Sequence, residues 1–209
     1  MILSDKIFAA LRLEIITGQL RPGDRIVELQ VAKSFGTSQA PVREALQRLG
    51  QEGLVETVRH TGTYVSHMSF SEMEQLFEMR RLIEITSGKI LLKRAGQDEL
   101  AVLQHSFDSM LAAARAGNMT HLIANDVEFH RSLIEGAKQT VFLRLWLTMD
   151  GQIRRFIANV TMKYFDDMEA LAERHRPILE AIKLRDNNEL THQLSEHLAL
   201  DDSWKPFLQ

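Results

Sequence analysis

The sequence contains no cysteine. It therefore forms no disulfides, thiolate zinc sites or iron–sulfur clusters, and it offers no cysteine nucleophile. It also lacks an uninterrupted run of about 18 apolar residues, the length needed to span a bilayer. The first 16 residues carry Asp5, Arg12 and Glu14, so they contain no apolar core of a signal peptide. We expect a cytoplasmic protein with no membrane partner.

The composition is that of an ordinary globular chain. Its 209 residues are 44% hydrophobic and 25% charged, and this length suits one or two domains. The net charge of −3 by itself argues against a nucleic-acid binder, but the charge is unevenly distributed along the chain. Residues 1–67 hold eight Lys and Arg against seven Asp and Glu, so the acidic excess lies in residues 68–209. Because DNA binding depends on a local basic face, the net charge does not exclude it.

The first 67 residues show the order of elements of a winged helix-turn-helix. Gly and Pro punctuate this region, and its pattern changes from helical periodicity to β-rich residues after Gly53. We therefore predict a DNA-binding domain over residues 1–67 with a β-hairpin wing. The expected elements are helices near 4–17 and 28–34, a third helix with Ser38 as N-cap, and strands 54–59 and 63–66 around His60-Thr61-Gly62.

The third helix has the pattern of a DNA-reading helix. Gln39 and Arg43 lie one turn apart on the face opposite the apolar stripe. Arginine bonds bidentately to guanine and glutamine to adenine, and Ser38 at the helix N-terminus suits a phosphate. On the hairpin, Arg59, His60 and Thr63 are expected to reach a neighbouring groove. The alternative interpretation is that Gln39, Arg43 and Arg48 form only a solvated helix face.

Four segments of this region form a recognisable set: ITGQLRPGDRI at 16–26, FGTS at 35–38, PVREAL at 41–46 and EGLV at 52–55. Together they resemble the GntR family of bacterial transcription regulators. The resemblance implies that Ser38, Gln39 and Arg43 face the operator, and that the wing tip, His60, Thr61, Gly62 and Thr63, approaches the minor groove. Gln39 and Thr61 stand where members of the family commonly carry Arg, so we expect a different operator sequence.

The remainder of the chain has a helical pattern from Ser69 onwards. Ser69 and Glu72 form the S-x-x-E pattern of a capping box at its start. We predict a mainly α fold, in which residues 68–209 form an all-α six-helix bundle. The six expected helices lie near 70–94, 97–116, 119–135, 139–162, 167–185 and 188–203.

One carboxylate and three imidazoles lie on the apolar faces of three of these helices. Asp126 and His130 are four residues apart on the third helix, His175 lies in the stripe of the fifth, and His197 in that of the sixth. A single such histidine is usually a satisfied core residue, but four unpaired ligand-type residues would cost roughly several kcal/mol. One Asp and three His suit Zn²⁺, Ni²⁺, Mn²⁺ or Fe²⁺. We predict one divalent transition-metal ion per chain at these four residues.

Arg80 and Glu84 also occupy core-facing positions, on the first helix of the bundle. One interpretation is a buried ion pair within the helix. The other is that the Arg80 guanidinium lines a cavity and binds the carboxylate of a small-molecule effector bidentately.

The spacing of these residues resembles the metal-binding pattern of the FCD effector domain in the FadR subfamily of GntR regulators. Six helices resemble the shorter, VanR-like variant. The resemblance implies a homodimer whose metal coordinates a small organic acid, with binding of the acid altering the operator affinity. The matching residues are Asp126, His130, His175 and His197, with Glu78 and Arg80 upstream.

We therefore expect a transcription regulator, acting as a repressor, that binds double-stranded operator DNA and responds to a small organic acid. Two alternatives remain at this point. In the first, the metal site of a DNA-binding regulator is purely structural. In the second, the chain is a helical metalloenzyme whose centre activates water. Glu128 is the one nearby acid of the motif and its helical position points away from the centre, so we predict no catalytic residue.

Overall fold

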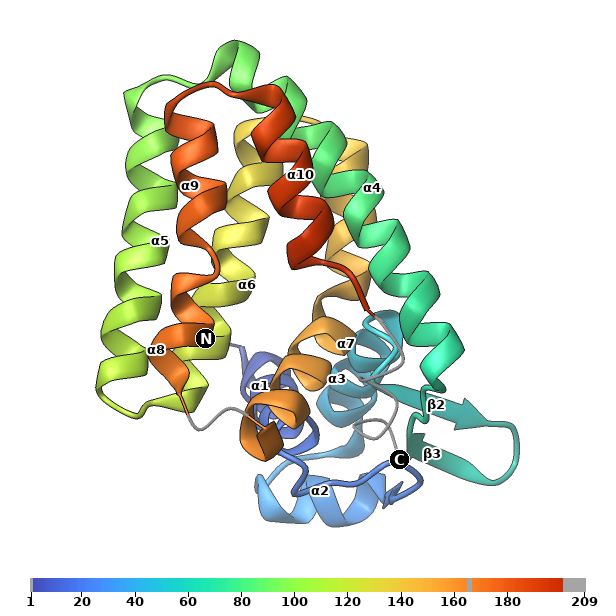
Figure 1. The fold of residues 1–209 in the computed structure, drawn as a ribbon. Helices are drawn as coiled ribbons and strands as arrows, with labels where there is room; N and C mark the ends of the chain where they lie inside the picture. Colours follow the sequence, from blue (N-terminus) through green and yellow to red (C-terminus); the bar gives the residue numbers. More distant parts are fainter. Residues whose placement is uncertain (1, 165–166, 201–209) are drawn as a thin grey trace. The chain divides into compact units, whose positions relative to one another are not determined.

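The computed structural model describes residues 2–164 and 167–200 (Figure 1). Contacts divide the chain into two compact units. The first unit comprises Met1–Met68 and Leu147–Asn159, and the second comprises Ser69–Trp146 and Val160–Gln209. Among the described residues, no helix is both long and apolar enough to cross a membrane.

The N-terminal unit combines helices with a small antiparallel sheet whose strand order is β1-β3-β2. Its core contains the fully buried Ile7, Val42, Leu49 and Val65, which come from α1, α3 and β3. The winged helix-turn-helix predicted here is confirmed. The sequence did not predict β1, a two-residue strand that pairs with β3 of the hairpin. The elements are α1 (Leu3–Ile16), β1 (Arg25–Ile26), α2 (Glu28–Ser34), α3 (Gln39–Gln51), β2 (Val55–Val58) and β3 (Gly62–Val65).

Helix α3 follows a short turn after α2, which is the place of the recognition helix in a helix-turn-helix. Its apolar stripe, Val42, Ala45 and Leu49, is buried because these positions recur on one face of the helix. Ser38 occupies the N-cap position with an extended backbone, but within the described chain its side chain makes no capping hydrogen bond. The prediction that Ser38 is the N-cap of this helix is therefore confirmed.

The wing is a tight hairpin between β2 and β3. Its register pairs Val58 with Gly62, and the turn between them contains His60 at φ 62° and Gly62 at φ 142°. Both φ values are positive, and glycine adopts such values without the steric cost that a Cβ imposes. The turn therefore forms at the His60-Thr61-Gly62 segment that the sequence indicates.

The middle of helix α7 (Thr140–Tyr164) belongs to the N-terminal unit. Arg155 donates from Nη1 to the carbonyl oxygen of Ser66 at 2.8 Å, and Gln152 donates to the carbonyl oxygen of Gly53. Arg155 and Gln152 are 5% and 4% exposed, so these bonds satisfy polar groups that would be costly to bury alone. The sequence places a boundary after residue 67 and gives no sign that residues 147–159 group with this unit.

The second unit consists of helices that begin at a complete capping box. The Ser69 hydroxyl accepts from the backbone N–H of Glu72, and the Glu72 carboxylate accepts from the backbone N–H of Ser69. Two helix boundaries differ from the predicted six-helix bundle. The stretch predicted as one helix at 167–185 is divided at His175, and the last helix ends at His197, with residues 201–203 outside the described chain. Besides α7, the helices are α4 (Phe70–Arg94), α5 (Gln97–Arg115), α6 (Met119–Gly136), α8 (Met168–Glu173), α9 (Arg176–Lys183) and α10 (Asn187–His197).

Candidate metal centre and DNA-reading face

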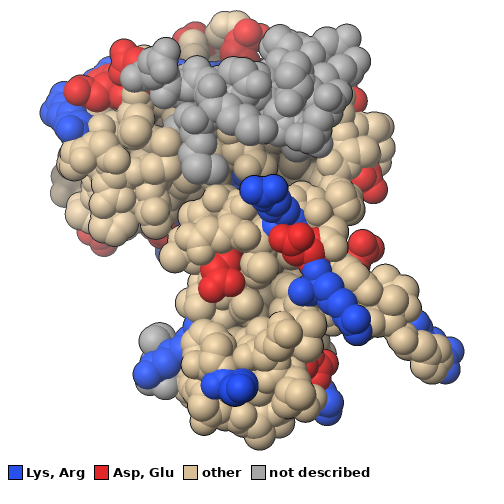
Figure 2. Space-filling view, turned by 90° about the horizontal axis from the view of Figure 1, so that it is seen from below, with Lys and Arg blue, Asp and Glu red and all other residues tan. Residues whose placement is uncertain are grey.

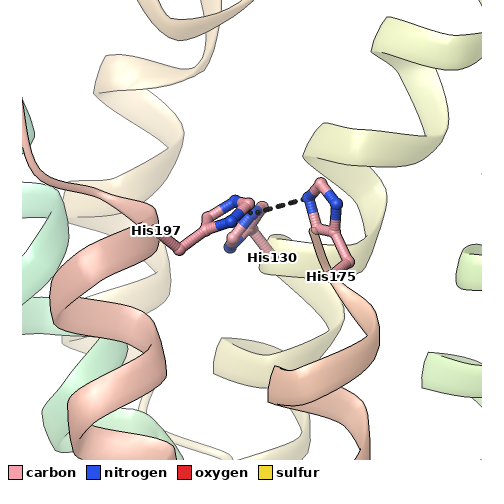
Figure 3. A group of neighbouring side chains, drawn as sticks. All are labelled: His130, His175 and His197. Atoms are coloured by element: carbon pink, nitrogen blue, oxygen red, sulfur yellow. Dashed lines mark hydrogen bonds between the residues drawn. The ribbon is translucent and has the colours of Figure 1, made fainter. Parts of the chain in front are cut away.

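Three histidine rings from separate helices converge in the second unit (Figure 3). His130 lies on α6, His175 immediately precedes α9, and His197 is the last residue of α10. The Nε2 atom of His130 lies 3.2 Å from Nε2 of His175 and 3.2 Å from Nε2 of His197. One nitrogen from each ring lies within 4.8 Å of the other two. The structure thus brings together the three histidines that the sequence singles out.

Asp126 adds a carboxylate to this group. Its Oδ2 lies 3.2 Å from Nε2 of His175, and the residue is 6% exposed. Its Oδ1 is buried and has no hydrogen-bond partner in the described part of the chain. Burial alone would raise the pKa of Asp126, but the imidazole of His175 holds it well below its usual range, so the carboxylate is ionised. A buried anion with an unpartnered oxygen is suited to a cation.

The tautomers of two rings follow from neighbours that only accept hydrogen bonds. Nδ1 of His175 lies 3.1 Å from the carbonyl oxygen of Ala172, and Nδ1 of His130 lies 2.6 Å from Oε2 of Glu84. Each Nδ1 therefore carries a proton, so the neutral form of each ring has its lone pair on Nε2. These lone pairs face one another across 3.2 Å, beside the ionised Asp126. Converging electron-pair donors of this kind fit a divalent transition-metal ion.

Glu84 lies behind His130 and is fully buried. Its Oε1 accepts hydrogen bonds from Nε of Arg80 at 2.6 Å and from Nε1 of Trp146 at 3.1 Å, while Oε2 faces His130. Burial alone would raise the pKa of Glu84, but His130 and Arg80 together lower it to about 2. Burial also lowers the pKa of His130, which favours the neutral ring that a metal ion requires.

Arg80 forms the buried ion pair that was one of the two interpretations of its position. The side chains of Arg80 and Glu84 are 2% and 0% exposed. This pairing does not use the whole guanidinium, because Nη2 of Arg80 is buried with no partner among the residues described. A buried unpaired donor is costly, and a ligand with an acceptor oxygen would satisfy it.

The reading face of α3 carries a preformed set of contacts around Arg43, which is 65% exposed. Its Nε donates to Oε2 of Glu28 at 2.7 Å, and its Nη2 donates to Oε1 of Gln39 at 3.0 Å. Ser38 is exposed at the start of the helix and Gln39 is half-buried. The three predicted residues therefore lie together at the N-terminal end of α3, with Glu28 of α2 as a neighbour.

The wing presents only some of its predicted residues to solvent. Arg59, His60 and Thr61 are exposed, and the Thr61 carbonyl accepts a 2.8 Å hydrogen bond from Nη2 of Arg25. Thr63 is 6% exposed, and its hydroxyl lies 3.2 Å from that of Thr57. Because alternate residues of β3 point to opposite faces, the Thr63 side chain faces inward. The predicted contact of the Thr63 side chain with DNA therefore does not fit its buried position.

Positive charge is not concentrated over a large area on the face drawn in Figure 2. Blue Lys and Arg side chains lie among red and uncharged ones there, as far as the described residues show. A basic face can be local, so the charge distribution on this face does not by itself exclude DNA binding.

Three contacts at these sites do not follow from the sequence pattern. They are the bonds of Glu84 to His130 and of Glu28 to Arg43. The third is the bond from Arg25 to the turn of the wing. Periodicity gives the buried side of a helix, but it does not give the partner on another element.

Two models of known protein families match this chain. The model of the FCD domain matches residues 75–200. The model of the gntR family of bacterial regulatory proteins matches residues 3–65.

Two curated relatives illustrate the similarity over most of the chain. The chain is 29% identical to a protein named as a probable D-xylose utilization operon transcriptional repressor of Paenarthrobacter nicotinovorans, with 90% of this chain and 81% of that one covered. It is 27% identical to the gluconate operon transcriptional repressor of Bacillus licheniformis, with 94% and 82% covered.

Solved structures share the fold. The structure of E. coli McbR/YncC has a TM-score of 0.80 and 19% identity, covering 95% of this chain and 94% of that one. A putative transcriptional regulator GntR from Rhodococcus sp. RHA1 has a TM-score of 0.76 and 21% identity, with 98% and 97% covered.

Proposed function

Because the chain belongs to the GntR family of bacterial regulatory proteins and carries an FCD domain, we propose that it is a regulator controlled by a small organic acid. The acid binds at a metal centre in the second unit, and its binding changes the affinity of the N-terminal unit for operator DNA. The observation that carries this proposal is the convergence of the three histidine rings beside an ionised aspartate.

The metal ion is held by Asp126, His130, His175 and His197. Their donor set is one carboxylate oxygen and three imidazole nitrogens, which suits Zn²⁺, Ni²⁺, Mn²⁺ or Fe²⁺. When bound, the ion supplies a positive charge that attracts a carboxylate group. One ion per chain is proposed.

The effector is a small organic acid, and Arg80 contributes to its binding. The unpartnered Nη2 of this buried guanidinium is a donor suited to a carboxylate oxygen. One relative is named for the gluconate operon, and gluconate is an organic acid. Substitution of Arg80 by Gln is expected to weaken acid binding, measured by calorimetry on the metal-loaded protein. Unchanged affinity would remove Arg80 from the effector site.

Operator recognition uses the exposed end of α3 and the tip of the wing. Arg43 reads a guanine, Gln39 contacts the adjacent base, and Ser38 at the helix N-terminus binds a phosphate. Arg59, His60, Thr61 and Gly62 approach the neighbouring groove. Each phosphate contact releases counterions, so the affinity should fall steeply with increasing salt.

The regulator acts as a homodimer, which matches the two half-sites of a palindromic operator. Two exposed apolar pairs in the second unit support this proposal. Met79 and Leu82 of α4 are 49% and 55% exposed, and Val141 and Leu145 of α7 are 53% and 47% exposed. Exposed apolar residues one turn apart on a helix can contribute to an association surface. The effector would then favour one arrangement of the two reading helices over another.

The decisive experiment measures operator binding with and without metal and acid. DNA sites are first selected from a random pool by the purified protein. The affinity for the selected site is then measured by fluorescence anisotropy. We expect a panel of small organic acids to change the affinity only when the protein holds its metal. The contrary outcome is that a chelator abolishes DNA binding while no acid changes the affinity of the metal-loaded protein. In that case the metal is purely structural and the sensing part of the proposal is wrong.

A further inference from the structure

We propose that Glu84 is a positioning residue of the metal centre: it fixes His130 in the tautomer that binds the ion, and Arg80 and Trp146 hold Glu84 in place. This inference rests on the metal centre proposed above. It concerns a residue outside the four ligands and assigns the buried Arg80–Glu84 pair a role in building the site.

The first step is the contact between the carboxylate and the ring. Oε2 of Glu84 lies 2.6 Å from Nδ1 of His130, and both side chains are fully buried. The two residues come from different helices, α4 and α6, which pack against each other. A carboxylate only accepts hydrogen bonds when ionised, so it holds the ring proton on Nδ1. The lone pair is then on Nε2, which points to His175 and His197.

The second step is that the carboxylate is itself fixed. Oε1 of Glu84 accepts from Nε of Arg80 at 2.6 Å and from Nε1 of Trp146 at 3.1 Å. Arg80 is one turn earlier on α4, and Trp146 is a fully buried residue of α7. Three donors therefore surround the carboxylate, and the positive charge of Arg80 offsets the cost of its burial. The carboxylate has little freedom to rotate away from His130.

The third step compares the rings. His175 has its Nδ1 proton fixed by a backbone carbonyl, that of Ala172. His197 has no such partner, because its Nδ1 is buried without a hydrogen bond to any described residue. The three ligands thus differ in how they are oriented, and His130 is the one held by a charged side chain. Partners of this kind orient a ligand and raise its basicity, and their loss typically weakens metal binding about 10–100-fold.

The test uses the nearly isosteric substitution Glu84→Gln, with Co²⁺ as the probe ion. Co²⁺ is titrated into metal-free full-length protein, and binding is followed by its visible absorption. We expect one ion per chain in both proteins and an affinity about 10–100-fold lower in Glu84→Gln. The matched control is Glu128→Gln, on the same helix as His130 but half-exposed and bonded to Arg131, which should bind Co²⁺ like the wild type. Equal affinity in Glu84→Gln would overturn the positioning role.

A second readout does not depend on metal or on the folding of Glu84→Gln. Long-range ¹⁵N–¹H spectra of the metal-free wild type report which ring nitrogen of His130 carries the proton, with assignment by His130→Gln. We expect the proton on Nδ1. A proton on Nε2 would overturn the proposal for Glu84. Failure of the wild type to bind Co²⁺ would instead overturn the proposed metal centre, so the two failures are distinguishable.

Discussion

Arg43 donates a 3.0 Å hydrogen bond from Nη2 to Oε1 of Gln39, one turn earlier on α3. Its Nε is bonded to Glu28, and its Nη1 makes no hydrogen bond to any residue that the structure describes. A glutamine that reads adenine needs both its amide oxygen and its amide nitrogen. The bond to Arg43 uses one of the two lone pairs of the Gln39 oxygen and none of the donors of its amide nitrogen. We therefore expect the pair to offer mainly donors to DNA and to favour base edges that accept hydrogen bonds.

Loss of Arg43 should weaken specific operator binding without unfolding the protein. The side chain is mostly exposed, and a bidentate arginine–guanine contact is worth about 1–3 kcal/mol of discrimination. We expect Arg43→Ala to bind the selected operator roughly 10–100-fold more weakly and to bind unrelated DNA nearly as well as the wild type. Anisotropy measures the affinities, and circular dichroism checks the fold.

The control for this experiment is Lys6→Ala, an exposed cation on α1 outside the proposed reading face. It should retain the preference for the operator over unrelated DNA. If Arg43→Ala keeps that preference too, Arg43 is part of a solvated helix face and does not read bases.

Metal content should depend on His175. Substitution by Ala removes one imidazole from the proposed ligand set and leaves Asp126 without its nearest partner. We expect about one transition-metal ion per chain in wild-type protein purified without a histidine tag, and nearly none in His175→Ala. Elemental analysis makes the measurement. His192→Ala, an exposed histidine on α10, should retain the ion; a similar metal content in both variants would contradict the assignment.

The metal-free protein should lose stability as the pH falls below about 6.5. Burial lowers the pKa of His130 and of His197 from this ordinary value. The unfolded chain then binds more protons than the folded one, so the free energy of unfolding decreases as the pH falls from 6.5 towards the folded pKa. The contribution of His130 is at most about 1.4 kcal/mol per pH unit.

Urea unfolding in the presence of a chelator, between pH 5 and 8, measures this dependence. Glu84 acts in the same direction only at lower pH, since its pKa is lowered to about 2. The exposed His105 offers a control, because His105→Gln should leave the pH profile unchanged. A free energy of unfolding that is constant from pH 5 to 7 would show that His130 and His197 do not titrate as proposed.

A larger side chain at Gly88 should weaken both stability and metal binding. A Cβ built at this position of α4 lies 2.9 Å from Cδ2 of Leu190 and 3.6 Å from Cδ1 of Leu194, both on α10. Since α10 carries His197, overpacking here would displace a ligand. We expect Gly88→Val to cost about 1–3 kcal/mol in the free energy of unfolding and to lower the affinity for Co²⁺. Lys89→Val, at the exposed neighbouring position, controls for the helix propensity of valine and should bind Co²⁺ normally.

The sequence predicts that Asp126 and the three histidines lie together because each is on a recognisable apolar stripe. Asp126 and His130 are one turn apart, so the same periodicity that buries the stripe buries both. The contact between Glu84 and His130 joins residues 46 positions apart. It depends on how α4 and α6 are rotated against each other, which no local pattern specifies.

The sequence does not indicate the break between α8 and α9 at His175, for a related reason. The periodicity of Leu171, His175, Ile178 and Ile182 continues across it, and the turn needs no glycine. At this break the backbone N–H and the Nδ1 of His175 both lie 3.1 Å from the Ala172 carbonyl oxygen. On the wing, a stretch rich in β-branched residues predicts the hairpin, but strand alternation decides that Thr63 faces inward.

The three histidines are far apart in the chain, since His175 and His197 lie 45 and 67 residues from His130. An ion bound to all of them would act as a removable cross-link that closes loops of these lengths, in a chain that has no cysteine to do so. Such closure restricts the unfolded ensemble and couples folding to metal supply. Metal starvation would then shorten the lifetime of the protein as well as silence its response.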